Sequence, residues 1–193
     1  MQELFEKNSL AVEGYDADRR GFLKHGLLFT AALGFWSPAL SFAAEDSGRA
    51  ISFNNAHTGE KFKGEYWQNG KYLPDAFSEI RNIMRDFRTG DKCAIDPRLI
   101  DVLFVVKEKV NSKAPFSLFS GYRSPKTNRM LRMRTEGVAR GSLHMQGQAA
   151  DINLPGVSLN KVEKTALALK MGGVGYYPKS GFVHIDTGRV RKW

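Results

Sequence analysis

The stretch at residues 142–151 reads Ser142-Leu143-His144-Met145-Gln146-Gly147-Gln148-Ala149-Ala150-Asp151, and a second stretch near the C-terminus reads Phe182-Val183-His184-Ile185-Asp186. Together they hold two of the four histidines of the chain and two aspartates. Two imidazoles and one carboxylate, with one coordination position left for water, form the ligand set of a catalytic zinc ion. The two stretches therefore indicate a Zn²⁺ site, and a zinc hydrolase is the working hypothesis.

The first stretch folds back on itself if its glycine forms a turn. His144 and Asp151 are seven residues apart, which is too far for one helical face. Gly147 predicts a turn between them, and residues 149–154 read as a strand. With His144 before the turn and Asp151 on the strand, both side chains can reach one point.

The second stretch reads as one arm of a hairpin over residues 175–186, with a turn rich in Pro and Gly. On its second strand, His184 and Asp186 are two residues apart and share a face. Asp186 then has two possible roles. It either holds His184 by its second ring nitrogen or reaches the reacting water as general base.

The rest of the chain predicts a scaffold around these ligands. The patterns favour a hairpin over 49–66 with a turn at 57–60, a buried strand over 116–119, and helices over 74–89, 97–110, 126–134 and 159–171. We expect an α+β domain in which a small antiparallel sheet carries the zinc ligands and several helices pack around it.

Three basic features of the scaffold have two interpretations each. Arg123 follows a strand and precedes a helix, so it faces either a cleft or solvent. His57 lies in a turn and either stabilises that turn or lines the cleft. The arginine-rich segment 129–140 is either a solvated loop or one wall of a groove for an anionic polymer.

Composition limits the class of partner. The chain has 193 residues and a formal net charge of +9, so an anionic partner is expected. Charge alone allows nucleic acid, a membrane surface or an acidic polymer such as cell wall. The one cysteine, Cys93, excludes an intramolecular disulfide and a thiolate metal cluster.

The N-terminal segment has the pattern of an export signal. Arg19-Arg20 precede a short apolar run, and small residues follow before Ala43. The paired arginines, followed by Phe-Leu-Lys, resemble a twin-arginine signal. We expect cleavage after Ala43, so that residues 1–43 are a signal peptide and 44–193 the domain that carries the zinc ligands. An uncleaved membrane anchor is the alternative, although polar residues and Pro38 interrupt the run.

Export through the twin-arginine route would place the protein in the periplasm. Contact with the membrane is then transient, during export only. Nucleic acid is not an expected partner, whereas peptidoglycan, an anionic wall polymer, is. The oligomeric state has no signature in the sequence.

Five segments resemble the zinc D-alanyl-D-alanine peptidase family, which includes VanX-type dipeptidases, phage endolysins and, more distantly, the hedgehog signalling domain. The metal signature is Ser142-x-His144-x-x-Gly147-x-Ala149-x-Asp151 followed by His184 on a strand. Similarity is greater to exported murein endopeptidases of the K type. It extends over Asn55-x-His57-Thr58-Gly59-Glu60, Ser120-Gly121-Tyr122-Arg123-Ser124, Gly172-Gly173-Val174-Gly175-Tyr176-Tyr177-Pro178 and Val183-His184-Ile185-Asp186-Thr187-Gly188.

This resemblance implies roles for individual residues. Zinc would be bound by His144, Asp151 and His184, and Arg123 would contact the substrate carbonyl or the developing oxyanion. Several relatives carry an acidic general base three residues before the last histidine, where this chain has Gly181. Asp186 is then the candidate for the base, with the structural role on His184 still open.

The sequence therefore predicts a zinc-dependent murein peptidase that hydrolyses stem-peptide cross-links during cell wall remodelling. We expect Asp186 and Arg123 to be catalytic and Ser142, Tyr176 and Tyr177 to bind substrate. Two alternatives remain at this point: a non-catalytic, zinc-containing wall-binding module, and a D,D- or L,D-carboxypeptidase that trims terminal D-alanine. The bond that is cut is not decided by these patterns.

Overall fold

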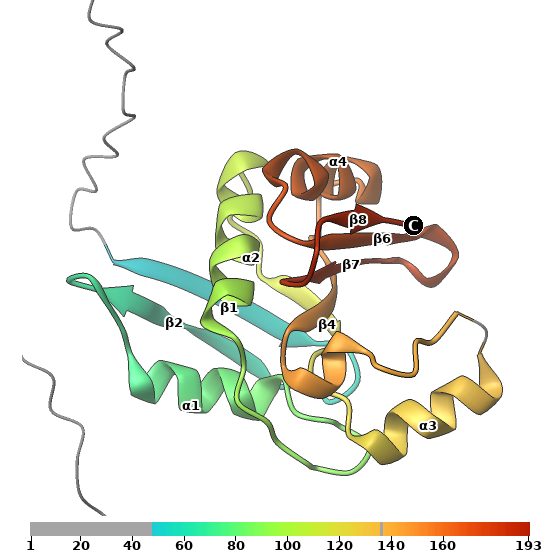
Figure 1. Cartoon of the computed structure of the whole chain (residues 1–193). Helices are drawn as coiled ribbons and strands as arrows, with labels where there is room; N and C mark the ends of the chain where they lie inside the picture. The colour runs from blue at the N-terminus through green and yellow to red at the C-terminus, as the bar shows by residue number, and fades with distance from the viewer. Residues whose placement is uncertain (1–47, 136) are drawn as a thin grey trace, which may run out of the picture. The chain divides into compact units, whose positions relative to one another are not determined.

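A computed structural model describes residues 48–135 and 137–193, and within this range the fold is α+β, with four α-helices and one eight-stranded sheet (Figure 1). The predicted signal peptide lies outside the described residues. Within the described range, no helix combines the length and the apolar character needed to cross a bilayer.

All eight strands belong to one mixed sheet in the order β3-β2-β1-β4-β5-β7-β6-β8. The β1/β4 and β6/β8 pairs are parallel and the other pairs are antiparallel. Their bounds are β1 Arg49–Asn55, β2 Lys61–Gln68, β3 Lys71–Tyr72, β4 Phe116–Ser120, β5 Ala149–Asn153, β6 Gly173–Tyr177, β7 Phe182–Asp186 and β8 Arg191–Lys192.

The predicted small antiparallel sheet is therefore wrong in size and in strand direction. The predicted N-terminal hairpin exists as β1 and β2, but it joins the ligand-bearing strands because β1 pairs in parallel with β4. Parallel neighbours need a long crossover connection, which the two helices between β2 and β4 supply. Local hydrophobic alternation identifies hairpins but does not show which strands meet across such a crossover.

The two faces of the sheet have different roles. Alternate residues of the central strands are buried in the hydrophobic core, including Leu118 on β4, Ile152 on β5 and Ile185 on β7. The intervening residues, Asp151 on β5 and His184 on β7, point to the other face. One face of the sheet thus supports the core, and the opposite face carries the polar site.

The helices are α1 Pro74–Ile83, α2 Pro97–Lys109, α3 Pro125–Arg134 and α4 Leu159–Leu169. Three of them have N-cap side chains, those of Asp96, Ser124 and Ser158, which accept backbone N–H groups of the first turn. Helix α1 contacts β2, and α4 contacts β6 and β7, as Figure 1 shows.

Helix α1 is shorter than predicted, ending at Ile83 instead of continuing toward Gly90. The carbonyl of Ile83 accepts the Asn55 side-chain amide at 3.1 Å, and the carbonyl of Met84 accepts the Tyr122 N–H at 2.7 Å. These tertiary hydrogen bonds replace the next helical turn. Phe87, which falls within the predicted helix range of 74–89, lies instead in the loop that follows α1. Helix α4 likewise ends two residues early, at a left-handed Lys170.

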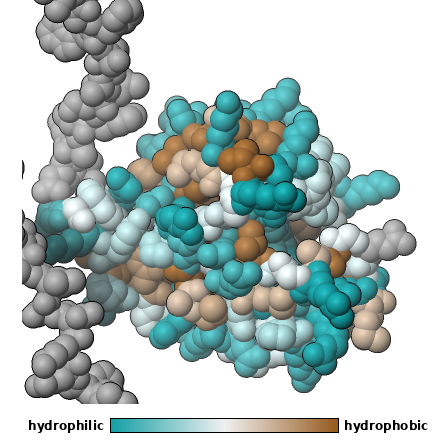
Figure 2. Space-filling model, viewed as in Figure 1, coloured by the Kyte–Doolittle hydropathy of each residue, from teal (hydrophilic) through white to brown (hydrophobic). Residues whose placement is uncertain are grey.

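The core is large and mostly enclosed. Its fully buried side chains include Tyr66, Phe53 and Phe116, and the ring centroids of Phe53 and Phe116 lie 5.9 Å apart. On the face of the molecule seen in Figure 2, hydrophilic residues surround smaller areas of hydrophobic ones. Among large apolar side chains of the described range, Trp193 is notable because it is 48% exposed yet lies at the polar site.

Candidate metal centre and cavity

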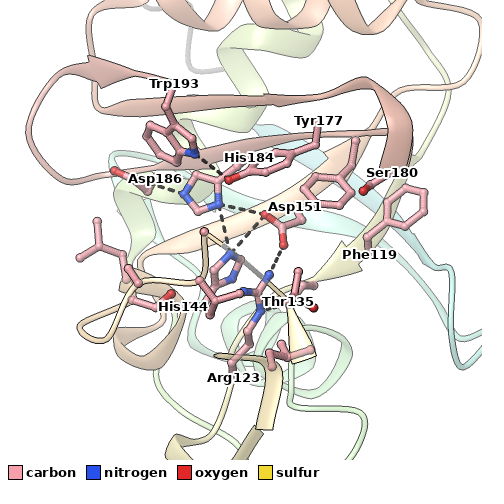
Figure 3. Close-up of a pocket in the computed structure, with 18 of the residues that line it drawn as sticks. Phe119, Arg123, Thr135, His144, Asp151, Tyr177, Ser180, His184, Asp186 and Trp193 are labelled. Atoms are coloured by element: carbon pink, nitrogen blue, oxygen red, sulfur yellow. Dashed lines mark hydrogen bonds and ion pairs between the residues drawn. The ribbon is translucent and has the colours of Figure 1, made fainter. Parts of the chain in front are cut away.

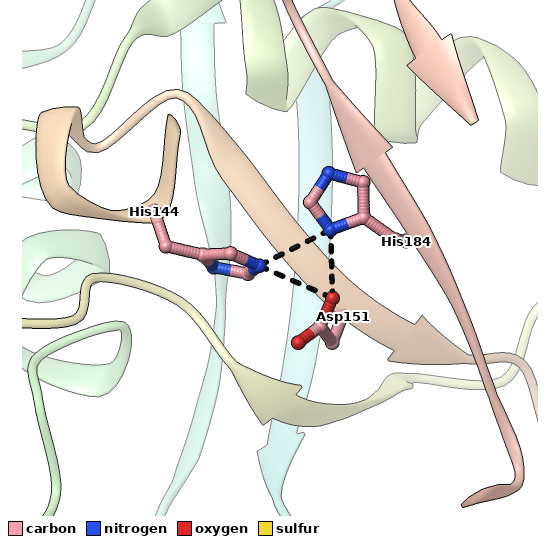
Figure 4. A group of neighbouring side chains, drawn as sticks. All are labelled: His144, Asp151 and His184. Carbon is pink, nitrogen blue, oxygen red and sulfur yellow. Dashed lines mark hydrogen bonds and ion pairs between the residues drawn. The ribbon is translucent and has the colours of Figure 1, made fainter. Parts of the chain in front are cut away.

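Three side chains that could each supply a metal-ligand atom converge on one point on the polar face of the sheet (Figure 4). His144 Nε2 lies 3.2 Å from Asp151 Oδ1 and 3.1 Å from His184 Nδ1, and His184 Nδ1 lies 2.9 Å from Asp151 Oδ1. All three residues are buried. The predicted ligand set is therefore brought together by the fold.

Strand pairing and one tight turn produce this convergence. Asp151 on β5 is the register partner of His184 on β7. His144 lies in the 3₁₀-helix η1 (Leu143–Gln146), which ends at Gly147 with φ of 66°. A Cβ at Gly147 would lie 2.0 Å from the carbonyl oxygen of Ala94, so both the left-handed backbone and the close approach require glycine.

The ring nitrogens that face away from the convergence point are also held. His144 Nδ1 lies 2.7 Å from the carbonyl oxygen of Gly121, an acceptor, and so carries the proton. His184 Nε2 lies 3.0 Å from Asp186 Oδ2. His144 Nε2 and His184 Nδ1 are therefore the ring nitrogens that face the shared point, and the second nitrogen of each ring is held by a partner, as in metal-binding histidines.

This donor set fits a zinc ion. Three atoms each about 2.1 Å from one ion at tetrahedral angles lie roughly 3.4 Å apart. The observed separations of 2.9–3.2 Å are close to this spacing. Two nitrogens and one carboxylate oxygen would supply three protein ligands to a zinc ion, the number that is typical of catalytic zinc sites.

The pKa values of the three residues follow from their burial and mutual contacts. Burial lowers the pKa of His144, more than the Asp151 carboxylate raises it. For His184, burial lowers the pKa, but hydrogen bonds to Asp151 and Asp186 outweigh it and raise the pKa overall. The pKa of Asp151 is lowered although burial opposes this, because both imidazoles and Arg123 stabilise its charged form.

Asp186 is fully buried behind His184 and has its hydrogen-bonding capacity occupied. Its Oδ1 accepts the backbone N–H groups of Gly173 and Gly188 at 3.0 and 2.9 Å. Arg191 donates to both carboxylate oxygens, at 3.0 and 2.7 Å. Burial opposes a low pKa, but the His184 and Arg191 contacts lower the pKa of Asp186. A carboxylate so placed is a weak base.

Arg123 contacts the same group of residues through Asp151. Its Nη2 donates to Asp151 Oδ2 and its Nε donates to Ser120 Oγ at 2.8 Å. Its backbone N–H donates to the carbonyl of His144 at 3.1 Å. The two oxygens of Asp151 therefore have different partners, with Oδ1 facing the histidines and Oδ2 facing Arg123.

A cavity of about 600 Å³ opens over the metal centre (Figure 3). Trp193 and Tyr177 lie together on its β6–β8 side, where the Trp193 indole Nε1 donates to the Tyr177 hydroxyl at 2.6 Å. The Trp193 ring centroid is 5.2 Å from that of His184. Phe119 and Phe182, with centroids 5.9 Å apart, form an apolar wall.

The other predicted site residues have different positions. Ser142 and Tyr177 line the cavity, whereas Tyr176 packs against the hydrophobic core and is not among the lining residues. Tyr176 and Tyr177 are adjacent on a strand and so point to opposite faces, which is the physical reason that only one of them reaches the cavity. His57 also lines the cavity, which was one of the two roles that its position in the sequence allowed.

The arginine-rich segment contributes uncharged residues to the cavity lining, including Leu131 and Thr135, rather than its arginines. Residues 137–139 and 141 line the cavity, and Asn128 on α3 holds this loop by donating to the carbonyl of Ala139 at 3.1 Å. Arg129, Arg132, Arg134 and Arg140 are exposed and are not lining residues. Their charge therefore belongs to the solvated surface.

Sequence reasoning does not single out Arg191 or Trp193, although both lie at the site. They reach it because β8 pairs with β6, which carries glycines where they pack. A Cβ at Gly173 would lie 2.3 Å from Arg191 Nη1, and one at Gly175 would lie 2.7 Å from the Trp193 ring. The spaced glycines of β6 are the signal that a bulky neighbour covers this strand.

Comparison with known proteins identifies close relatives over nearly the whole chain. A family profile described as peptidoglycan L,D-endopeptidase MepK matches residues 43–193. The peptidoglycan L,D-endopeptidase MepK of Escherichia coli K12 is 39% identical over 182 residues, covering 94% of this chain and 100% of the relative. The probable peptidoglycan L,D-endopeptidase MepK of Haemophilus influenzae is 35% identical over 179 residues, covering 92% and 96%.

Among solved structures, the L-Ala D-Glu endopeptidase ChiX of Serratia marcescens aligns with a TM-score of 0.31 and 19% identity. The alignment covers 39% of this chain and 62% of that protein.

Proposed function

The chain belongs to the peptidoglycan L,D-endopeptidase MepK family and is a murein peptidase, and we propose that it cleaves peptide cross-links with a Zn²⁺ ion held by His144, Asp151 and His184. The observation that carries the metal proposal is the convergence of Nε2, Oδ1 and Nδ1 of these residues within 3.2 Å of one another. The L,D specificity in the names of the relatives is the specificity we propose here.

The metal supplies the Lewis acidity of the reaction: zinc in such a site polarises a peptide carbonyl and makes water a stronger acid. The chain itself supplies orientation. The Gly121 carbonyl and the Asp186 carboxylate fix the two imidazoles by their second nitrogens, at 2.7 and 3.0 Å. Ligands fixed in this way do not have to reorganise when substrate enters the cavity.

Arg123 is proposed to stabilise negative charge that develops on the substrate carbonyl oxygen. Its side chain is only 15% exposed and its guanidinium donates to Asp151 and Ser120, so it is oriented before substrate binds. A donor fixed in a cavity that excludes water acts more strongly on developing charge than one in bulk solvent.

Asp186 is proposed to position His184 rather than to act as general base. A base must be free to accept a proton, and every contact of Asp186 stabilises its charged form in a fully buried place. The alternative role from the sequence, holding His184 through its second nitrogen, agrees with the 3.0 Å contact. Ser142 and Tyr177 are proposed to contact substrate, since both line the cavity.

Action on peptidoglycan implies that the protein works outside the cytoplasm, and we propose export through the twin-arginine signal at residues 1–43 to the periplasm. The paired arginines and apolar run support this proposal. Fractionation of cells that carry the wild type or the Arg19→Lys, Arg20→Lys double variant tests it. Retention of the variant in the cytoplasm is the expected result, and unchanged export contradicts the twin-arginine route.

The function is tested with purified chain lacking residues 1–43, loaded with one zinc per molecule, and defined cross-linked muropeptide dimers. Mass spectrometry of the products identifies the bond that is cut. We expect separation of the two stems by wild type and none by His184→Ala. Release of terminal D-alanine alone would indicate a carboxypeptidase. Binding without cleavage, with metal content and fold intact, would indicate a wall-binding module.

A further inference from the structure

We propose that Arg88 is a specificity-determining residue, which binds a free carboxylate of the peptide substrate on the wall of the cavity beside the metal centre. The proposal rests on the proposed peptidase function and adds the chemistry by which substrate is selected. Arg88 is one of the residues that line the cavity. It comes from the loop after α1 that the sequence pattern places in a helix.

The charges of the cavity leave Arg88 without a partner. Three arginines line it, and two of them are already paired: Arg123 with Asp151, and Arg191 with Asp186 at 2.7 Å. Arg88 makes no ion pair with any residue in 48–135 or 137–193. Both aspartates that line the cavity already form ion pairs with other arginines. The Arg88 guanidinium therefore remains available to an anion that enters from outside.

The Arg88 side chain is held against a stack of rings. Its guanidinium carbon lies 4.1 Å from the centroid of the Phe87 ring. The imidazole of His57 stacks on Phe87 with centroids 3.9 Å apart and planes at 15°. A guanidinium resting on an aromatic ring loses less side-chain freedom when it binds a ligand, which favours binding.

A buried carboxylate fixes the loop that carries Arg88. Asp86, 1% exposed, accepts the backbone N–H of Arg88 at 3.0 Å and that of Ser124 at 2.9 Å. Ser124 directly follows Arg123, so one carboxylate anchors the backbone at Arg88 and next to Arg123. The backbone positions of Arg88 and Ser124 relative to each other are therefore set by the fold.

The two guanidiniums are close enough to influence each other. Burial lowers the pKa of Arg88; of the nearby charges, Asp86 raises it and Arg123 lowers it further. A carboxylate placed against Arg88 would offset this repulsion as well as form the bidentate hydrogen bonds that suit a guanidinium. Stem peptides present such carboxylates at their termini and side chains, whereas amidation removes the charge and the second acceptor.

The proposal is tested by comparing Arg88→Gln, Arg88→Lys and wild type on two cross-linked dimers, one with free carboxylates and one with the same groups amidated. We expect wild type to have a kcat/KM roughly 10- to 100-fold higher on the free acid. Arg88→Gln should bring the free acid down to the amide value, mainly through KM. Arg88→Lys should recover part of the difference, because it keeps charge without the planar fork.

The matched control is Arg132→Gln, which removes one exposed arginine of α3 that does not line the cavity. It should retain the wild-type preference for the free acid. Equal kcat/KM on the two dimers for wild type overturns the proposal. An Arg88→Gln loss of the same size on both dimers also overturns it, since the effect would not pass through the carboxylate.

Equilibrium binding separates this proposal from the proposed function. Titration of zinc-loaded protein with an uncleaved stem peptide, as free acid and as amide, measures carboxylate recognition without catalysis. A preference for the free acid in wild type that Arg88→Gln abolishes supports the Arg88 proposal even if no cross-link is hydrolysed. Equal affinities for the two peptides overturn it even if hydrolysis proceeds.

Discussion

Arg191 donates to both carboxylate oxygens of Asp186, from Nη1 to Oδ1 at 3.0 Å and from Nη2 to Oδ2 at 2.7 Å. The same carboxylate accepts from His184 at 3.0 Å. Arginine, aspartate and histidine thus form a chain of contacts in which Arg191 fixes Asp186 and Asp186 fixes the imidazole. In this series of contacts, His184 is the residue that belongs to the candidate metal centre.

The first prediction concerns this chain of contacts. Asp186→Asn should weaken zinc affinity by roughly 10- to 100-fold, because the partner of a ligating histidine sets its orientation and basicity. Arg191→Gln should have a smaller effect in the same direction, since Asp186 keeps its contacts to Gly173 and Gly188. Competition with a chromophoric chelator measures the affinity.

Turnover at saturating zinc distinguishes this positioning role from that of a general base. With the site fully occupied, Asp186→Asn should retain kcat within about tenfold of wild type. Loss of a general base typically costs about 10²- to 10⁴-fold in rate. A fall of that size at full zinc occupancy and unchanged zinc affinity would restore the catalytic role that the sequence suggested for Asp186.

The second prediction concerns metal removal. Zinc that binds only the folded state adds about 2.7 kcal/mol of stability at a free concentration 100 times its Kd. For a domain of this size, Tm should then fall by roughly 5–10 °C on chelation and recover when zinc is returned. His144→Ala, which lacks one ligand, should show little zinc-dependent change in Tm. Identical melting of the chelated and reloaded wild type would contradict the metal site.

The third prediction concerns Arg123. Lysine cannot donate to Ser120 and Asp151 at once while facing the cavity, as the arginine fork does. Arg123→Lys should therefore lower kcat by about 10²- to 10³-fold at saturating zinc, the cost of removing one oxyanion donor. Arg85→Lys, which alters an ion pair with Glu60, is the matched control. A kcat within threefold of wild type for Arg123→Lys would remove it from catalysis.

Much of the candidate metal centre could be predicted from the sequence because its determinants are local. The turn at Gly147 and the two-residue spacing of His184 and Asp186 place the side chains through backbone geometry alone. The three donor atoms then meet because β5 and β7 are neighbours in the sheet. A hairpin and a strand with a clear alternation are the elements that short-range patterns describe best.

The rest depends on contacts that no short pattern contains. The carbonyl groups of Ile83 and Met84 accept hydrogen bonds from Asn55 and Tyr122, and α1 therefore ends early. Arg88 then lies in a loop that lines the cavity. Apolar spacing continues through Phe87, so periodicity extends the helix too far. The parallel pairing of β1 with β4 and of β6 with β8 is similarly a long-range choice.

The fourth prediction compares two glycines with positive φ. Gly147→Ala should lower the free energy of unfolding by more than about 3 kcal/mol, combining roughly 1–2 kcal/mol for the left-handed backbone with a clash against the Ala94 carbonyl. Gly59→Ala meets open space and should cost only the backbone part. Urea denaturation measures both. Equal losses for the two variants would show that the close approach at Gly147 relaxes without cost.

The fifth prediction concerns the stability contribution of Asp86 at low pH. Burial would raise its pKa, but hydrogen bonds from Thr127, Ser124 and the backbone N–H of Arg88 lower it below the ordinary value of 3.8. The unfolded chain therefore binds the proton more tightly than the folded chain. The ionised Asp86 thus contributes stability above about pH 4, and this contribution is lost as pH falls through the lowered pKa.

Asp86→Asn should be less stable than wild type at pH 7, by about 1–3 kcal/mol, because an amide oxygen replaces a charged acceptor of two backbone N–H groups. The difference between the two proteins should shrink between pH 5 and pH 2.5, since wild type alone loses the charge; Asp96 and Glu60 titrate in both and cancel. Urea denaturation across this range measures the difference, and a gap that stays constant with pH would mean that the Asp86 charge does not contribute.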